Sequence, residues 1–194
     1  MNICVYGASS EQIDRDFIAT CEHFGSVLTK SGYGIIFGAG KYGLMGAVAR
    51  GATKAGSTSL IGVVPEFFKS RDVLYDKCTD LVFTKTMRER KKYMEDNSIA
   101  FVMLPGSIGT FDEFFEILTL KQLGQHNKPI VVYNINNYFD PLLNMIKACI
   151  DKKFLTDDCY NLFSVCDTAT AVVNAIENDT SVLYDKYDTL DKEE

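Results

Sequence analysis

Short apolar runs bounded by glycine or proline alternate with longer segments of helical periodicity, and this alternation constrains the fold more than any other feature. The runs cover residues 2–6, 33–37, 59–64, 99–104 and 129–133, with a weaker run at 80–84. Runs of this length between helices are typical of strands covered on both faces, which form parallel sheets. The chain is therefore expected to adopt an α/β, Rossmann-like, doubly wound fold with a mostly parallel sheet and helices on both faces.

The segments between the runs predict the helices and the domain boundaries. Helical spacing covers residues 12–31, 43–55, 87–97, 111–123, 139–151 and 168–178. A length of 194 residues suits one domain, which we expect over residues 1–180, followed by an acidic C-terminal tail at 181–194. Ligands of such folds bind at the carboxyl ends of strands, so the candidate turns are residues 7–10, 38–43, 65–72 and 105–110.

Charge and composition exclude several classes of partner. The net charge of −6 and the pI of about 5.0 give no electrostatic footprint for nucleic acid or an anionic membrane. The six cysteines include no C-x-x-C pair, and the chain opens on a strand pattern, so we expect a cytoplasmic protein with reduced cysteines. The two histidines lack metal-ligand spacing, and we expect neither a metal nor a cofactor.

The segment from Gly38 to Gly43 matches G-x-G-x-x-G between a strand and a helix. This motif favours a dinucleotide site when it follows the first strand and an acidic residue ends the next one. Here it follows the second strand, and Glu66 lies beyond Pro65, which is a poor position for that acid. We interpret Gly40 and Gly43 as contacts to a phosphate or ribose, with tight turn geometry and NAD(P) binding as the alternatives.

A second glycine loop, Pro105 to Thr110, follows the most apolar run and precedes a predicted helix. Gly106 and Gly109 would let a ligand approach the backbone, and the free N–H groups of a first helical turn favour an anion. The hydroxyl of Thr110 adds a donor. The loop therefore predicts a phosphate site.

Glu113 has two interpretations. In the first, Thr110 caps the helix and Glu113 completes a capping box, which is a structural role. In the second, Glu113 shares a helical line with Ile117 and Leu120 and lies at the edge of the buried face, where a carboxylate can be partly desolvated.

A charged helix carries the complementary feature. Met87, Arg90, Lys91 and Met94 fall on one helical stripe, and the methionines suggest that this stripe faces the core. Buried cations need an anionic partner, such as a carboxylate or a substrate phosphate. The alternative is a solvated basic face whose side chains extend past the methionines.

These motifs resemble a known family. Pro105 to Glu113 is similar to the P-G-G-x-G-T-x-x-E signature of the LONELY GUY (LOG) family, and Met87 to Lys91 resembles its M-x-x-R-K segment. Gly38 to Met45 resembles its second turn, and Cys4 to Ser9 its opening strand and turn. The resemblance implies a homodimeric phosphoribohydrolase that hydrolyses the N-glycosidic bond of cytokinin riboside 5′-monophosphate, or of AMP, to free base and ribose 5-phosphate.

The resemblance also implies residue roles. Glu113 and Arg90 would be the catalytic pair, and Asp72 would replace a substrate-contacting glutamate of the family. The other residues implied to line the nucleotide site are Lys91, Ser107, Ile108, Gly109, Thr110, Asp112 and Thr119. Ser107 replaces the second glycine of the signature, where its Cβ crowds the phosphate or its hydroxyl donates to it.

Two other classes of function remain open at this point. One is a non-catalytic nucleotide-binding module, and the other is an NAD(P) oxidoreductase. Members of the family often carry the label lysine decarboxylase, but this chain has no lysine in a recognisable cofactor-binding context and no pyridoxal phosphate pattern.

Overall fold

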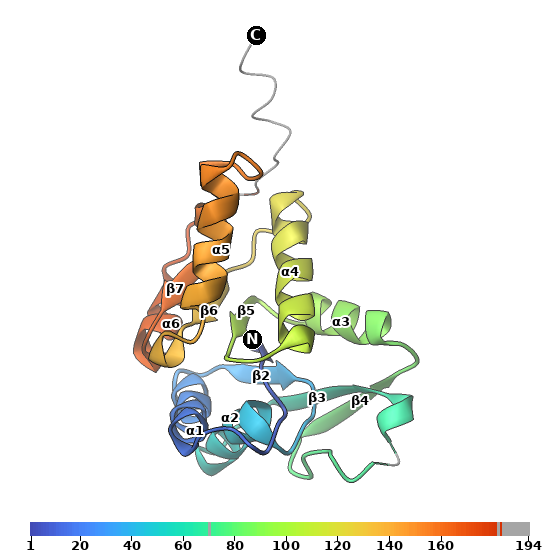
Figure 1. Cartoon of the computed structure of the whole chain (residues 1–194). Helices are drawn as coiled ribbons and strands as arrows, with labels where there is room; N and C mark the ends of the chain where they lie inside the picture. The colour runs from blue at the N-terminus through green and yellow to red at the C-terminus, as the bar shows by residue number, and fades with distance from the viewer. Residues whose placement is uncertain (70, 182, 184–194) are drawn as a thin grey trace.

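The computed structural model, which describes residues 1–69, 71–181 and 183, contains one parallel sheet (Figure 1). The strands are β1 (Asn2–Tyr6), β2 (Gly34–Phe37), β3 (Leu60–Pro65), β4 (Asp80–Thr84), β5 (Ala100–Met103), β6 (Ile130–Tyr133) and β7 (Ser164–Cys166). Their order is β4-β3-β2-β1-β5-β6-β7, and every neighbouring pair is parallel. The predicted Rossmann-like α/β class is confirmed.

Helices cover both faces of the sheet, with α1 and α2 on one side and α3 to α5 on the other (Figure 1). They are α1 (Arg15–Lys30), α2 (Gly43–Lys54), α3 (Met87–Asp96), α4 (Ile108–Gln122), α5 (Asp140–Asp151) and α6 (Ala169–Glu177). Short 3-10 segments are η1 (Glu66–Phe68), η2 (Ile135–Asn137) and η3 (Asp157–Leu162). No helix in the described ranges is long and apolar enough to cross a membrane.

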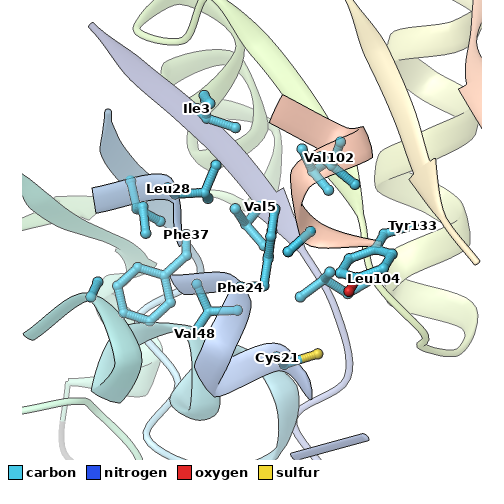
Figure 2. Close-up of a cluster of buried hydrophobic side chains, with 14 of the residues drawn as sticks. Ile3, Val5, Cys21, Phe24, Leu28, Phe37, Val48, Val102, Leu104 and Tyr133 are labelled. Carbon is cyan, nitrogen blue, oxygen red and sulfur yellow. The ribbon is translucent and has the colours of Figure 1, made fainter. Parts of the chain in front are cut away.

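The alternation of side chains along the central strand divides the core into two layers. Ile3 and Val5 of β1 pack with α1, α2 and α6, as Figure 2 shows for part of this cluster. Cys4 and Tyr6 point to the opposite face and pack with Met94 and with residues of α4 and α5. Burial on both faces explains why the central strands β2, β5 and β6 are apolar and buried along their whole length.

Two boundary predictions were wrong. Helix α4 begins at Ile108 rather than at residue 111, because Ser107 has extended backbone and its carbonyl accepts from the Phe111 N–H at 2.9 Å. Helix α1 begins at Arg15 rather than at residue 12, because the Asp14 side chain caps it. Thr110 therefore lies inside α4, and the capping-box interpretation of Glu113 is incorrect.

The C-terminal end of the chain adds one element that the apolar pattern did not predict. Strand β7 has three residues, none fully buried, and pairs with β6 at the sheet edge, so its sequence carries no apolar run. The predicted acidic tail at 181–194 lies outside the described residues except for Ser181 and Leu183.

The sheet order creates a crevice at the carboxyl ends of its central strands. Chain connections run from β1 toward β2 on one side, and β5 flanks β1 on the other, so the order reverses between β1 and β5. Such a switch point leaves room for a ligand between the turn that follows β1 and the turn that follows β5. Those turns are joined directly, since the Ala8 N–H donates to the Pro105 carbonyl at 3.0 Å.

Candidate active site

A pocket of about 420 Å³ lies at this switch point. The turns after β1, β2, β3 and β5 all contribute to its walls, together with α3 and α4. The four turns singled out from the sequence thus converge on one cavity, as the carboxyl ends of parallel strands should.

The pocket wall contains a buried ion pair. Arg90 of α3 and Glu113 of α4 have side chains only 8% and 11% exposed, and Arg90 Nη1 donates to Glu113 Oε1 at 2.6 Å. Arg90 Nε also donates to the Val63 carbonyl of β3 at 3.1 Å. The guanidinium is therefore held at two points, one on the sheet and one on the carboxylate.

The Glu113 carboxylate keeps one oxygen available. The hydrogen bonds among the described residues engage only Oε1, and no fully buried side-chain oxygen in that part of the chain lacks a partner. Oε2 is consequently the oxygen that the pocket can reach. Burial raises the pKa of Glu113, while the Arg90 guanidinium opposes that rise and favours the ionised form. This combination gives a carboxylate that is desolvated, oriented and able to accept a proton.

Gly38, at the end of β2, makes room for the guanidinium. A Cβ at this position would lie 2.4 Å from Arg90 Nη2 and 3.1 Å from the sulfur of Met45. The glycine is therefore required by the ion pair and not by backbone conformation.

We expect Gly38→Ala to lower activity by displacing Arg90, with a loss of stability of about 1–3 kcal/mol from overpacking. Chemical denaturation measures the stability, and release of free base from a nucleotide measures the activity that the family resemblance implies. Wild-type values in both would show that Arg90 can move without consequence and that the close approach to Gly38 has no role.

The loop from Pro105 to Thr110 forms another wall. Ser107, Gly109 and Thr110 line the pocket, and Ser107 is the N-cap of α4 without a side-chain capping bond. The first-turn N–H groups of a helix have no partner within that helix and carry the positive end of its dipole. Three residues at the start of this helix line the pocket, and this arrangement suits an anion.

Another part of the pocket lining is largely apolar. It is formed by Val64 and Pro65 at the end of β3, by Phe68, and by Leu74, with Met87 from α3. The 71–75 segment is fixed there because it pairs with the turn after β2: the Lys41 N–H donates to the Val73 carbonyl at 2.8 Å. This part of the pocket suits an apolar group.

Several residues of the predicted site lie outside the pocket walls. Asp72 is 96% exposed and pairs with Lys41 at 2.7 Å on the rim. Lys91 binds Asp112 at 3.0 Å and also Glu116, so it links α3 to α4 away from the cavity. Thr119 is exposed two turns further along α4 and lines a separate shallow surface.

The remaining predicted residues differ in their contributions. Gly40 lines the pocket, and Ile108 is 83% exposed. Gly43 has a φ of +60° and packs on the turn after β1, where a Cβ would lie 2.5 Å from the Ala8 carbonyl oxygen. Turn geometry therefore accounts for this glycine of the G-x-G-x-x-G motif.

The helical stripe on α3 faces the core only in part. Arg90 and Met94 are buried, as expected, but Met87 is 41% exposed because it lies at the pocket mouth. The sequence interpretation also missed Met45, Val73 and Leu74 as pocket residues. Their only signal was their position after strands β2 and β3.

The described part of the chain offers neither a cluster of metal ligands nor a reactive thiol beside the ion pair. No group of three or more histidine, cysteine or acidic side chains there could hold a metal ion. Cys4, behind the ion pair, is fully buried, and burial raises the pKa of its thiol to about 12, so it is protonated at neutral pH.

The fold and pocket define a Rossmann-like α/β protein whose switch-point pocket is lined by a buried carboxylate–guanidinium pair. Comparison with known proteins gives the family. The sequence model of the protein family described as "Possible lysine decarboxylase" matches residues 45–176 of this chain. The chain is 31% identical to the cytokinin riboside 5′-monophosphate phosphoribohydrolase LOG of Oryza sativa subsp. japonica over 90% of its length and 72% of that protein. It is 35% identical to the corresponding enzyme of Rhodococcoides fascians, covering 81% of this chain and 79% of that one.

The chain therefore belongs to this family, the LOG family, whose named phosphoribohydrolases are hydrolases acting on N-glycosyl bonds. The fold extends to more distant proteins. The molybdenum cofactor binding protein of Rippkaea orientalis superposes with a TM-score of 0.69 at 16% identity, covering 91% of this chain and 95% of that one. That likeness concerns the fold alone.

Proposed function

We propose that this protein is a nucleoside 5′-monophosphate phosphoribohydrolase that converts cytokinin riboside 5′-monophosphate or AMP to free base and ribose 5-phosphate. The observation that supports this most is the buried Arg90–Glu113 pair in the wall of a pocket that also contains a glycine-rich helix N-terminus. The names of the rice and bacterial relatives agree with this substrate class.

The proposed chemistry centres on Glu113. Hydrolysis of an N-glycosidic bond develops positive charge at the anomeric carbon, which an adjacent carboxylate stabilises. As a water oxygen bonds to that carbon, the bond to the base nitrogen breaks, and the base leaves with the bonding pair. Glu113 accepts the proton of the water as general base, and the departing base takes up a proton. Arg90 keeps Glu113 ionised and fixes its orientation.

The glycine-rich loop and the apolar part of the pocket lining would recognise different parts of the nucleotide. The loop from Gly106 to Thr110 would bind the 5′-phosphate through backbone N–H groups. The apolar wall with Phe68 and Leu74 would contact the base. Binding energy at the phosphate positions the ribose against Glu113, so it contributes to turnover as well as to affinity.

The test is release of free base from AMP and from isopentenyladenosine 5′-monophosphate, followed by chromatography. We expect free base from at least one of them. Nucleotide binding without base release would instead indicate a non-catalytic nucleotide-binding module. A saturable nicotinamide fluorescence titration without base release would indicate an NAD(P) site.

A further inference from the structure

The turn between β6 and α5 places a tyrosine against the glycine-rich loop. Asn136 and Asn137 are consecutive residues with left-handed backbone, at φ values of 52° and 59°. Non-glycine residues seldom adopt this conformation, and such residues concentrate near functional sites. The Asn134 side chain stabilises the turn, since its Oδ1 accepts from the Phe139 N–H at 2.7 Å and its Nδ2 donates to Asp140 Oδ1 at 2.8 Å.

The turn places the Tyr138 hydroxyl against the backbone of the glycine-rich loop at Pro105 to Thr110. This hydroxyl donates to the Gly106 carbonyl at 2.6 Å, across 32 residues of sequence. The ring is held edge-on by Phe17 of α1 and by Phe139, with centroids 6.1 and 5.0 Å away. Packing therefore fixes the ring independently of the hydroxyl.

The Gly106 carbonyl belongs to the same peptide unit as the Ser107 N–H. The described chain contains no cis peptide bond, and in a planar trans unit the C=O and N–H groups point in opposite directions. A hydroxyl that holds the carbonyl on one side therefore aims the Ser107 N–H to the other side. That N–H has no hydrogen-bond acceptor among the residues that the structure describes.

The Thr110 side chain also restrains the Gly106–Ser107 peptide unit. Gly106 is buried, and a Cβ there would lie 2.1 Å from Thr110 Oγ1, so Thr110 packs directly on it. Tyr138 and Thr110 together leave the Gly106–Ser107 peptide little freedom to rotate. Preorganised donors bind an anion better than donors that must reorient.

We propose that Tyr138 is a positioning residue that orients the Ser107 N–H toward the phosphate of the substrate. This inference rests on the proposed function and names a residue that lies outside both sequence motifs. Tyr138 itself does not line the pocket, so it acts through the loop and not on the reacting atoms.

The experiment compares Tyr138→Phe with wild type and with Tyr160→Phe. Tyr160 is a matched control, because it is 39% exposed against 43% for Tyr138, and its hydroxyl donates to the Leu143 carbonyl away from the pocket. Calorimetry measures binding of ribose 5-phosphate. Kinetics give kcat and KM for AMP and the slow rate for adenosine.

For Tyr138→Phe we expect ribose 5-phosphate binding to weaken by about three- to tenfold, the range of one hydrogen bond, with a matching rise in KM for AMP. The adenosine rate and the melting temperature should stay near wild type, since no phosphate is involved and the ring packing is kept. Tyr160→Phe should match wild type throughout.

Two results would overturn the inference. If wild type binds ribose 5-phosphate and Tyr138→Phe binds it equally well, Tyr138 does not position the loop, while the proposed function stands. An equal loss toward AMP and adenosine would indicate a general structural role. If wild type neither binds ribose 5-phosphate nor cleaves AMP, the proposed function fails and this inference fails with it.

Discussion

Glu113→Gln should fold normally and lose turnover by a factor on the order of 10²–10⁴. Glutamine preserves the size of the side chain, but it can neither accept the proton of the attacking water nor offset positive charge at the anomeric carbon. The carboxylate oxygen not bound by Arg90 is the group that is lost. Base release from AMP measures the effect, and circular dichroism confirms the fold.

Glu116→Gln is the matched control for this variant. Glu116 lies on the same helix, 40% exposed, and pairs with Lys91 outside the pocket. It should keep wild-type turnover. A folded Glu113→Gln protein with nearly wild-type base release would remove Glu113 from the mechanism.

The pH dependence of kcat/KM provides a second test of the role of Glu113. Burial raises the pKa of Glu113, and only the ionised form can act as base. Activity should therefore fall on the acid side at a higher pH than the ordinary glutamate value of about 4.3. A kcat/KM profile that stays flat below that value would contradict the assignment.

Arg90→Lys should also lower activity strongly, by on the order of 10²-fold, although the charge is kept. Lysine cannot donate simultaneously to the Val63 carbonyl and to Glu113, so the carboxylate loses its fixed position. A displacement of about 1 Å at a reacting group can have an effect of this size. Steady-state kinetics of the folded variant provide the measurement.

Stability measurements test the contribution of the Arg90–Glu113 ion pair to folding separately from its role in catalysis. Arg90→Met leaves a buried carboxylate without its partner and should lower the free energy of unfolding by about 3–5 kcal/mol. Adding Glu113→Gln should recover part of this loss, because no buried charge remains. If the double variant is no more stable than Arg90→Met, the two side chains are not coupled in the folded protein.

The fold could be predicted because its signals are local. Each buried strand is a short apolar run, and each run ends at a turn that the sheet topology brings to one edge. The same holds for part of the site. A cation placed on a helix beside Met94 must find a partner, and the structure brings Arg90 against Glu113.

Other features depend on geometry that no short pattern encodes. The start of α4 depends on the extended backbone of Ser107, and a capping-box pattern three residues later was misleading. Met87 is exposed because the helix stripe ends at the pocket mouth and not in the core. The contact between Tyr138 and Gly106 requires β5 and β6 to be neighbours and two asparagines to adopt left-handed backbone.

The most direct test of the account compares AMP with adenosine at equal concentration and measures adenine and ribose products together. A net charge of −6 gives little long-range attraction for a nucleotide, so recognition of the phosphate must come from the loop at Gly106 to Thr110. We predict rapid release of adenine and ribose 5-phosphate in equal amounts from AMP, with adenosine a poor substrate. Equal rates of adenine release from the two compounds, or none from AMP and from isopentenyladenosine 5′-monophosphate, would contradict the account.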